Sequence, residues 1–546
     1  MPVCEPDGAR GMISDPRYGH AVFPAPVLAT AWGAALRMAG LVLMVWLVAA
    51  GLLPGGRAMA AQDKVAAQQT VRWAADSSAD VPYTFHDPAK PERLTGFEYD
   101  LMQEMQRHMG VPFQFVQNDW DGLIPGLQRG LYEMVICGIE MTAEHADSID
   151  FSDPYYVTSE RLTVRRKGPQ LTTLASLSGH AVGTLKDTQA AQILGRNPNV
   201  ELRTYEEESD AFMDLVNGRT DAVLLDGPIA KYYGDTNPAL HVVGEPIGRV
   251  EYGIAFEKGQ NEALRGRVNA ALAAMRTDGT LHRVLARWDL WTPEMVQLTG
   301  DDSVLDIPPT AFYSYVAEIQ GKTGWRVKLE RYVGFIPQLV RAAWLTLLVS
   351  LSAMVLAVAL GLVLALVRLY GPAPLAWLAA CYVEIVRGTP LLIQVLLIFY
   401  GLPQCGVNLT PFVAGVISLG MNYAAYEAEN YRAGLQSVAF GQTEAAMALN
   451  MTHAQALRYV VVPQAFRLVM PVMTNDFISL LKDSSLVSVI TLTELTQTYI
   501  RLSSTYFDYF GTGLMVGLAY LLLGLPFVRL AKLAERRLAS PHTRRR

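Results

Sequence analysis

The sequence predicts two folded parts of different classes in one chain. These are a two-lobed α/β domain and an all-α membrane domain of about five transmembrane helices. Of the 546 residues, 51% are hydrophobic and the net charge is −6, which is too apolar for a purely soluble protein and too charged for a purely membrane one. Strand, turn and amphipathic-helix patterns alternate over residues 70–291, whereas apolar runs near spanning length recur over 335–530. We therefore predict an outer domain at 70–291, a linker at 292–332, a membrane domain at 333–532 and a basic cytoplasmic tail at 533–546.

The first 60 residues are predicted to be a secretory signal peptide or an uncleaved membrane anchor. An apolar run at 38–54 follows Arg37 and precedes the small-residue site AMA at 58–60. Both alternatives export the domain that follows, and the absence of a Cys after the run does not support a lipoprotein anchor. Cys137 is the one cysteine of four within the outer domain, so we expect no disulfide there and a stability that depends on the core.

Apolar segments and basic flanks predict the topology independently of the leader. The predicted spans are 337–367, 375–402, 411–426, 466–490 and 511–530. Basic residues cluster after the first span, in the loop before the fourth and after the last, which marks those sides as cytoplasmic. An odd number of spans that ends inside must begin outside, so the outer domain is again placed outside the membrane.

The segment EAAMALNMTHAQALRYVVVP, at 444–463, lies between the third and fourth spans on a predicted cytoplasmic side. It resembles the coupling loop of binding-protein-dependent ABC permeases, and the residues that match are Glu444, Ala445, Ala446 and Pro463. Asn450 stands where the family has Gly, and Asn tolerates the left-handed backbone better than most residues. We therefore expect the helix-turn-helix shape to persist. An ordinary amphipathic helix pair is the alternative.

Two further membrane segments resemble polar-amino-acid permeases. VEIVRGTPLLIQVLLIFYGLP, at 383–403, is similar to their second-span region, and LKDSSLVSVI, at 481–490, to their fourth. Polar groups at membrane depth usually face a protein interior, so the candidate residues of a translocation path are Lys482, Asp483, Ser484 and Ser485. Alternatively, Lys482 and Asp483 lie at the membrane interface.

The outer domain resembles the two-lobed binding proteins for polar amino acids over nearly all of its length. The stretches that carry the resemblance are TGFEYDLMQEM (95–105), DWDGLIPGLQRG (119–130), IDFSDPYY (149–156), DAVLLDGPIAKYY (221–233) and VEYGIAFEKG (250–259). The third looks like the crossover into lobe two, at roughly 157–247, and the last two look like return strands. Such a fold, similar to type II periplasmic binding proteins, places its ligand in the cleft between the lobes.

The resemblance implies a ligand site formed by Asp76, Trp120, Gly138, Glu140, Thr142, His145, Thr188, Gln189 and Asp226. Trp120 would be an aromatic wall, or otherwise a core aromatic. Asp226 matches the acid that pairs with a ligand's α-ammonium group, a charged bond of roughly 1.5–3 kcal/mol. The aromatic residue usual in the first loop is not evident, because Ala79 and Asp80 stand there.

The predicted pocket departs from the family at Glu140 and His145. They stand where the family has a small hydroxyl residue and an Arg that grips the ligand carboxylate. Exchanging a bidentate cation for His and adding an acid lowers the affinity for an anionic group, so we expect a cationic or amine-rich ligand. Alternatively, His145 is a surface residue, and Thr142, backbone amides or Thr188 hold the carboxylate.

The sequence contains no GxxxxGK[ST] phosphate loop, so we expect ATP hydrolysis on a separate subunit. The resemblance implies an ABC ATPase partner that holds ATP-Mg, a second copy of this chain and a small polar solute, with no cofactor, metal or nucleic acid bound here. The linker would hold the outer domain near the permease at about millimolar local concentration. The prediction is therefore a non-enzymatic importer subunit of a bacterial inner membrane. The alternatives are a ligand-gated channel, a sensor, or a binding-protein-like dehydratase that uses Glu140 and His145; the coupling loop favours the importer.

Overall fold

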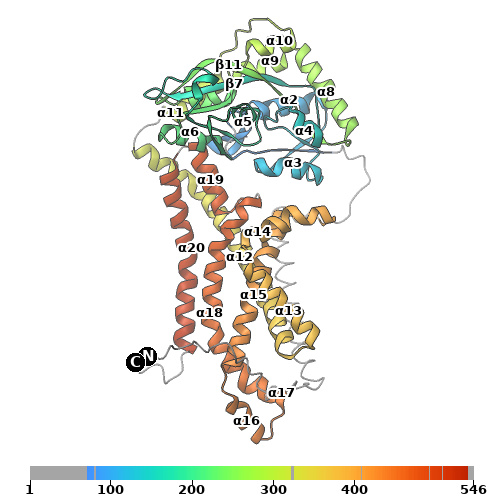
Figure 1. The fold of residues 1–546 in the computed structure, drawn as a ribbon, viewed down its shortest axis with the longest axis vertical. Coiled ribbons are helices and arrows are strands. Elements are labelled where there is room, and N and C mark those ends of the chain that lie inside the picture. The colour runs from blue at the N-terminus through green and yellow to red at the C-terminus, as the bar shows by residue number, and fades with distance from the viewer. Residues whose placement is uncertain are drawn as a thin grey trace, which may run out of the picture.

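The structure is a computed structural model that describes residues 70–78, 81–320, 325–407, 409–490, 492–506 and 508–538. An α/β domain lies at one end of a long helical bundle (Figure 1). The predicted signal peptide or anchor, Asp80 in the first loop, and most of the basic tail fall outside these residues.

Two five-stranded sheets form the two lobes of the outer domain. Lobe one has the order β4 (Phe113–Gln117), β1 (Val71–Ala75), β5 (Met134–Val135), β12 (Ala255–Glu257) and β6 (Ile149–Phe151). Lobe two has the order β11 (Leu240–Tyr252), β7 (Tyr156–Arg165), β10 (Ala222–Asp226), β8 (Ala181–Leu185) and β9 (Glu201–Tyr205). A separate hairpin joins β2 (Phe85–Asp87) to β3 (Lys90–Thr95).

The chain crosses between the lobes twice. The first crossing joins β6 to β7 within the predicted stretch 149–156, and the second joins β11 to β12 within 250–259. Lobe one is therefore split in sequence around lobe two, as predicted. The stretch 221–233 looks like a return strand in the sequence, but it lies in lobe two, within the predicted bounds of 157–247. Its strand β10 pairs with β7 and β8 in lobe two, and all five of its residues are buried, as in a strand covered on both faces.

The helices of lobe one are α2 (Phe97–Met109), α3 (Trp120–Gln128), α4 (Ala143–Ser148), α8 (Glu262–Thr277) and α9 (Thr280–Arg287). Those of lobe two are α5 (Gln189–Gly195), α6 (Glu208–Val216) and α7 (Gly227–Ile229), which continues into a π-turn at Ala230–Asp235. In α2, Phe97, Leu101 and Met105 are four residues apart and buried, so one face of the helix packs on the core. Gly110, with φ of 63°, ends α2 in the left-handed conformation that favours glycine.

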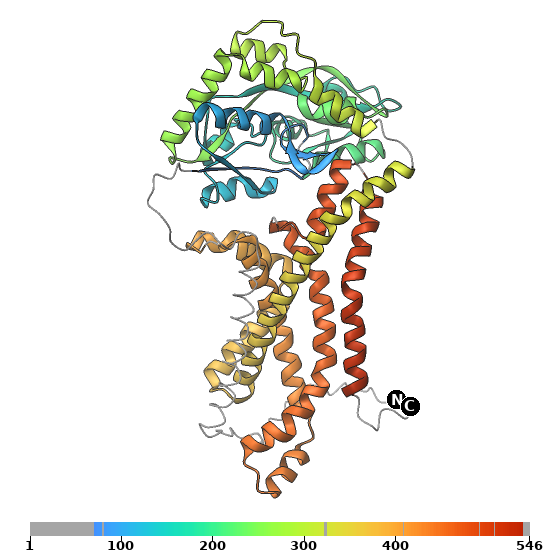
Figure 2. The ribbon, with the colours of Figure 1, turned by 180° about the vertical axis from the view of Figure 1, so that it is seen from behind.

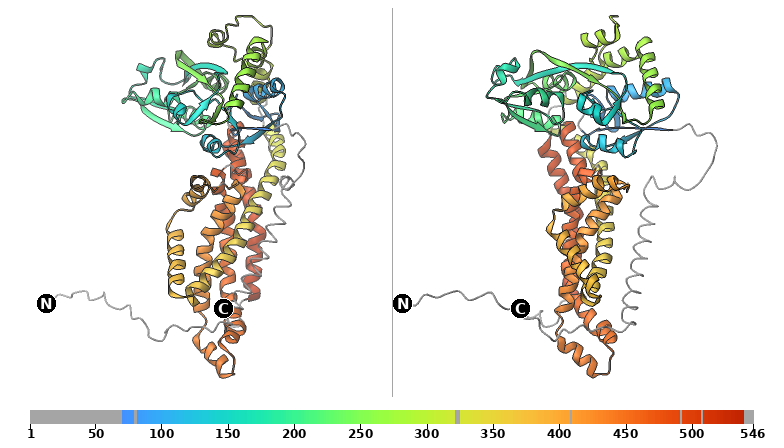
Figure 3. Two further views of the ribbon diagram at one scale, coloured as in Figure 1. Left: turned by 90° about the vertical axis from the view of Figure 1, so that its right-hand side faces the viewer. Right: turned by 45° about the vertical axis from the view of Figure 1, so that its right-hand side comes forward.

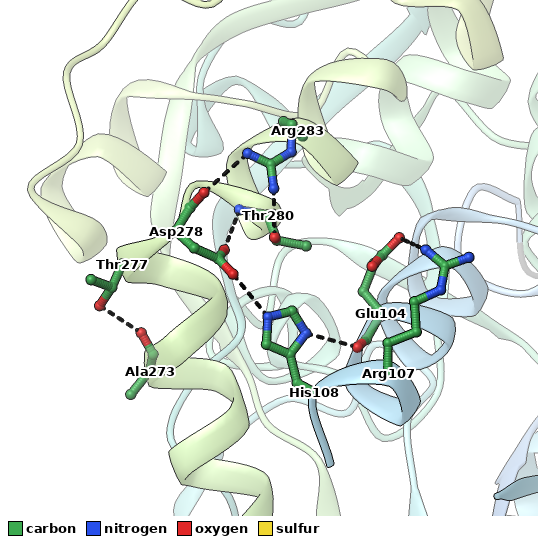
Figure 4. Close-up of polar contacts among 8 residues, drawn as sticks. All are labelled: Glu104, Arg107, His108, Ala273, Thr277, Asp278, Thr280 and Arg283. Atoms are coloured by element: carbon green, nitrogen blue, oxygen red, sulfur yellow. Dashed lines mark hydrogen bonds and ion pairs between the residues drawn. The ribbon is translucent and has the colours of Figure 1, made fainter. Parts of the chain in front are cut away.

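A polar cluster joins α2 to the turn between α8 and α9 (Figure 4). Nδ1 of His108 lies 2.9 Å from the carbonyl oxygen of Glu104, and Nε2 lies 2.8 Å from Oδ2 of Asp278. Both partners can only accept, so both ring nitrogens donate and His108 is an imidazolium. The hydrogen bond with Asp278 accordingly raises the pKa of His108, while hydrogen bonds from Thr280 and His108 lower the pKa of Asp278 to about 2.

The segment predicted as a linker contains two helices, α10 (Pro293–Thr299) and α11 (Thr310–Gln320). Tyr315 of α11 is only 4% exposed and joins the core of the outer domain, and the ring of Phe312 meets the edge of Tyr232. This part of the chain is therefore packed on the outer domain.

Nine helices of the described chain form the membrane domain and its loops. They are α12 (Trp325–Tyr370), α13 (Ala373–Gly388), α14 (Leu391–Leu396), α15 (Pro411–Gln436), α16 (Phe440–Ala448), α17 (His453–Ala456), α18 (Val462–Asp483), α19 (Leu495–Tyr506) and α20 (Tyr509–Leu538). Among the described residues, three helical segments are long and apolar enough to cross a membrane, 325–370, 453–490 and 509–533. A pair bent by 110°, 373–388 with 391–401, would be a fourth. The 26-residue α15 packs between α12 and α18 but is less apolar than these segments. The predicted number of five spans therefore stays a prediction.

Small residues allow α12 and α15 to approach closely. Ala353, Ala357, Gly361 and Ala365 recur every four residues along α12 and are all buried. A Cβ atom on Gly361 would lie 2.7 Å from Cβ of Glu427 on α15, closer than packed atoms tolerate. Such stripes are typical of helix interfaces in membranes, because the backbones can come near each other.

The outer domain and the pair α16–α17 lie at opposite ends of the bundle. The view from behind and the two turned views agree on this arrangement (Figures 2 and 3). The helices between them, α12, α15, α18 and α20, run side by side along the long axis. A signal from the outer domain to α16 must therefore travel the full length of the bundle.

Candidate ligand cavity and coupling helices

A cavity lies between the two lobes of the outer domain. The space between its walls is about 540 Å³, a volume that includes solvent at the open mouth. Its lining residues are Asp76, Tyr83, Trp120, Cys137, Gly138, Glu140, His145, Leu185, Asp187, Thr188, Glu206, Glu207, Glu208, Asp226 and Ile229. Many of them directly follow the carboxyl ends of β1, β5, β8, β9 and β10, where α/β sheets place their ligands.

Seven of the nine residues predicted for ligand binding line this one cavity. They are Asp76, Trp120, Gly138, Glu140, His145, Thr188 and Asp226. Thr142 and Gln189 do not line it. The hydroxyl of Thr142 accepts the N–H of His145 as the N-cap of α4. The backbone N–H of Gln189 donates to Glu140, which does line the cavity.

Asp226 is held by three hydrogen bonds at the end of β10. Its Oδ2 accepts the phenolic hydroxyls of Tyr83, at 2.8 Å, and of Tyr252, and its Oδ1 accepts the N–H of Ile229. Tyr83 belongs to lobe one and Asp226 to lobe two, so this bond crosses between the lobes. No aromatic residue stands at 79–80, but Tyr83, three residues further along the sequence, lines the cavity.

Glu140 also connects the lobes. Its Oε2 accepts the backbone N–H of Gln189 at 2.6 Å, so a carboxylate of lobe one is bonded to the start of α5 in lobe two. Nδ1 of His145 lies 2.8 Å from the carbonyl oxygen of Glu140. Because a carbonyl only accepts, Nδ1 carries a proton, and Nε2 of a neutral ring is an acceptor.

The remaining polar side chains around the cavity are engaged locally. Asp76 accepts the N–H of Ser78 and of Trp120, both at 2.8 Å, which fixes the start of α3. Thr188 caps α5 by accepting the N–H of Ala191, and its hydroxyl donates to the carbonyl of Leu185.

The cavity is strongly acidic. Seven of the described lining residues are Asp or Glu and none is Lys or Arg. Burial raises the pKa of Asp226 and of Asp76, and raises that of Glu140 to about 8 with a further contribution from the charge of Asp226. A bound cation would lower the pKa values of these carboxyl groups, because it stabilises their ionised form.

Two more buried carboxyl groups lie close behind the lining. Burial raises the pKa of Glu98 to about 8, and raises that of Glu160 well above its usual value, with Glu140 and Asp226 adding to the shift. Neither oxygen of Glu160 has a hydrogen bond of good geometry among the described residues. The nearby backbone N–H of Ala190 offsets a small part of the rise in the pKa of Glu160. Oε2 of Glu98 likewise has no partner among them.

Sequence reasoning missed eight lining residues. They are Tyr83, Cys137, Leu185, Asp187, Glu206, Glu207, Glu208 and Ile229. The acidic run at 206–208 directly follows β9, and the position of a short acidic run after a strand is the signal that could have found it. Cys137 is buried and forms no disulfide with another cysteine of the described chain.

The outer domain contacts the membrane domain through both lobes. From lobe one, Arg129 donates to the carbonyl of Phe399 at 3.0 Å, and its guanidinium lies 4.8 Å from the centre of the Phe399 ring. Asp119, also of lobe one, accepts from Nε2 of Gln497 on α19 at 2.8 Å. From lobe two, Ser209 and Asp210 each lie 2.9 Å from the hydroxyl of Tyr509 on α20. The membrane helices thus contact residues that adjoin the cavity, because Asp119 precedes Trp120 and Ser209 follows Glu208.

The predicted coupling segment is a helix-turn-helix. Glu444 and Ala445 are exposed on α16, Ala446 is buried, and Thr452 caps α17. Asn450 has φ of 62°, the left-handed conformation expected at the position where the family has Gly. Pro463 lies in the first turn of α18, where its missing N–H is harmless.

The four candidate path residues lie at the end of α18 nearest the outer domain. Lys482 is exposed on this chain, and Asp483 accepts the hydroxyl of Tyr423 at 2.7 Å. Ser484 is buried and donates to the carbonyl of Leu481, and Ser485 is half-buried. Their role in translocation stays a prediction.

Comparisons with known proteins cover both parts of the chain. Residues 72–290 match the profile of bacterial extracellular solute-binding proteins, family 3, and residues 357–540 match that of the binding-protein-dependent transport system inner membrane component. Over 206 residues the chain is 33% identical to the arginine transport system permease protein ArtQ of Bacillus subtilis, covering 38% of this chain and 94% of that protein. Over 200 residues it is 36% identical to the L-cystine-binding protein TcyJ of Escherichia coli K12, covering 36% and 74%. A solved ancestral arginine-binding protein bound to glutamine is 32% identical, with a TM-score of 0.38, covering 41% and 98%.

The two family matches and the two curated relatives define a class of protein: the binding domain and the permease domain of an amino acid ABC transporter, joined in one chain. The chain belongs to the bacterial extracellular solute-binding proteins, family 3, in its outer domain, and to the binding-protein-dependent transport system inner membrane components in its membrane domain.

Proposed function

We propose that this chain is the substrate-binding and permease subunit of an ATP-driven importer for amino acids or related amine-bearing solutes. The observation that carries the proposal is the position of the acidic cavity and of α16 at opposite ends of one bundle. The two relatives are named for arginine transport and for L-cystine binding, which supports a polar amino acid or a close derivative as the solute.

The proposed cycle uses both domains. The lobes close around the solute, the closed domain rests on α19 and α20, and the solute passes into a path that includes Lys482, Asp483, Ser484 and Ser485. A partner ABC ATPase holds ATP-Mg and receives α16 with Glu444. Because one chain forms half of a translocation path, two copies assemble with two ATPase subunits in a bacterial inner membrane, with the outer domain on the periplasmic or extracellular side.

Charge determines the proposed selectivity. Asp226 pairs with the ammonium group of the solute, and Trp120 packs against its stem or stacks on a cation. Since no Lys or Arg lines the described cavity, a basic solute should bind at least about tenfold more tightly than an acidic one, or about 1.4 kcal/mol.

The test is ligand binding and stimulated ATP hydrolysis by the full-length chain. The chain is reconstituted in nanodiscs with an amino-acid-class ABC ATPase, and basic, neutral and acidic amino acids and simple amines are titrated. We expect a basic compound to bind and to stimulate hydrolysis, and Asp226→Ala to abolish both effects. Binding of no amino acid or amine, with no stimulation by any of them, would overturn the proposed function. Tight binding of glutamate, or binding indifferent to Asp226→Ala, would overturn the roles assigned to the cavity residues.

A further inference from the structure

The donors around the cavity are already used by the chain's own acceptors. Glu140 accepts the backbone N–H of Gln189 at 2.6 Å, and Asp76 accepts those of Ser78 and Trp120. The hydroxyl of Thr188 donates to a backbone carbonyl. A ligand carboxylate that entered this space would therefore have to displace a carboxylate of the protein from its N–H donors.

The negative charge of the cavity lining also disfavours a ligand carboxylate. A ligand carboxylate would lie among seven acidic side chains with no Lys or Arg among the described lining residues, and like charges at short range repel. His145 is the single imidazole of the lining, and its Nδ1 proton is used by the carbonyl of Glu140. The arrangement thus disfavours the negative end of an α-amino acid.

The cavity instead offers carboxylates from both lobes to a positively charged ligand. Asp226 of lobe two and Glu140 of lobe one both line it, and each raises the pKa of a common neighbour, the buried Glu160. One ammonium group at Asp226 would leave Glu140 with no cationic partner among the described lining residues, and the oxygens of Glu160 lack a hydrogen bond of good geometry within the described chain. Within the same described residues, no group of His, Cys, Asp and Glu side chains is placed to hold a metal ion, which favours an organic cation.

We propose that the ligand is an organic compound with two cationic nitrogen groups and no free carboxylate, a linear diamine or its guanidino counterpart. One cationic group pairs with Asp226, and the other pairs with Glu140 where an amino acid would carry its carboxylate. This inference rests on the proposed function and narrows its substrate class.

Matched pairs of compounds test the inference on the unaltered chain. Cadaverine and lysine differ by one carboxylate, as do agmatine and arginine, so each pair isolates the group in question. Binding to the full-length chain in nanodiscs is measured by isothermal titration at pH 7.5. We expect at least one decarboxylated compound to bind about tenfold or more tightly than its amino acid.

Two substitutions locate the effect at Glu140 and His145. Glu140→Gln keeps an acceptor for the N–H of Gln189 but removes the charge, so the preference for the diamine should fall to within about threefold of unity. His145→Arg adds a cation and should move the preference toward the amino acid of each pair. Glu262→Gln, on an exposed side chain of α8, is the control and should change neither preference. Thermal unfolding of each variant shows whether it is folded.

The outcomes separate this inference from the proposed function. If an amino acid binds as tightly as its decarboxylated counterpart in both pairs, or if a neutral or acidic amino acid binds and no diamine does, the inference is wrong and the importer proposal stands. If Glu140→Gln folds and leaves the preference unchanged, Glu140 is not the second contact and the inference is also wrong. If no amine and no amino acid binds, both proposals fail.

Discussion

The ammonium group of Lys186 lies 2.5 Å from Oδ2 of Asp121 and joins the two lobes of the outer domain. Lys186 follows β8 of lobe two, whereas Asp121 lies in the first turn of α3 in lobe one. Nζ of Lys186 also lies 3.2 Å from Glu206, a residue of the cavity lining. The ion pair therefore forms at the edge of the ligand cavity and exists only while the lobes are close together.

Lys186→Ala should weaken ligand binding modestly by favouring the open arrangement of the lobes. Asp121 is 53% exposed, and exposed ion pairs contribute about 1 kcal/mol or less, so we expect a loss of affinity of up to about fivefold. The loss should shrink at high salt. Arg203→Ala, which removes an exposed ion pair with Glu201 inside lobe two, is the control. An equal effect of both variants would contradict a role for Lys186 in closure.

The cluster of His108 and Asp278 should make the stability of lobe one depend on pH. Because folding raises the pKa of His108, its contribution to the free energy of unfolding is fully present below its unfolded pKa of about 6.5. That contribution is lost as the pH rises through the higher folded pKa. The lowered pKa of Asp278 means that its contribution is present above about 3.8 and lost as the pH falls through about 2. The cluster therefore stabilises most between about pH 4 and 6.5.

His108→Gln should lower the unfolding temperature of the outer domain at pH 5.5 by up to about 3 °C, and by much less at pH 9. Differential scanning calorimetry of the full-length chain at both pH values measures this difference. Arg107→Gln is a matched control, because Arg107 on the same helix keeps its charge and its ion pair with Glu104 at both pH values. A pH-independent effect of His108→Gln would show that the ring acts by packing alone.

Local patterns explain which parts of the fold the sequence could predict. The coupling helices were predictable because the EAA pattern, Asn450 and Pro463 act on neighbouring backbone, and the φ of 62° at Asn450 agrees with that expectation. The crossovers were predictable because their motifs span both lobes. The reading of β10 as a return strand failed because a fully buried strand carries no signal that tells one sheet from the other.

The candidate cavity was predictable only in part for a similar reason. Asp226 and Glu140 lie within motifs, so a resemblance could point to them. Glu206 to Glu208 enter the cavity because β9 ends beside β8 and because lobe two lies over lobe one, which are relationships of the fold and not of the neighbouring sequence. The hydrogen bond that Glu140 accepts from the backbone N–H of Gln189 could not be predicted either, because nearly every residue type has a backbone N–H.

Gly361→Leu should disrupt the packing of α12 on α15. Even a Cβ atom at this position would lie 2.7 Å from Glu427 and 3.0 Å from the carbonyl oxygen of Ala424, so the helices must separate. We expect a loss of at least about 2 kcal/mol, seen as a lower unfolding temperature and a lower yield of folded chain. Gly334→Leu on the same helix is the control, because nothing lies within 4 Å of its added Cβ. Equal tolerance of both substitutions would mean that the two helices do not pack through Gly361.

Arg129→Ala should uncouple the outer domain from the membrane domain without changing the cavity. Arg129 contacts the carbonyl and the ring of Phe399 and does not line the cavity. Losing a charged hydrogen bond and a cation–π contact, together about 2 kcal/mol, should reduce ligand-stimulated ATP hydrolysis several-fold and leave ligand affinity within about twofold. Arg249→Ala, at an ion pair with Glu251 within the outer domain, should leave both unchanged. A parallel loss of affinity in Arg129→Ala would point to a disturbed fold.

Glu444→Lys should abolish the stimulation of ATP hydrolysis by ligand while ligand binding persists. Glu444 is exposed on α16 at the end of the bundle farthest from the outer domain, and the exposed apolar side chains Phe440 and Leu449 flank it. An exposed apolar patch with a charge beside it is typical of a docking surface, and reversing that charge opposes the cationic groups of a partner that would bind it. Ligand binding should be unaffected, because the cavity lies at the other end of the bundle.

The assay is ATP hydrolysis by the full-length chain reconstituted in nanodiscs with its ATPase, with and without ligand, beside a titration of the same preparation. Glu262→Lys makes the same charge change on an exposed helix of the outer domain and should leave stimulation intact. Asn450→Val adds an independent variant: a β-branched residue resists the left-handed conformation that Asn450 adopts, so the turn should distort and stimulation should fall as in Glu444→Lys. Normal stimulation in both Glu444→Lys and Asn450→Val would show that α16 and α17 are not the surface that the ATPase binds.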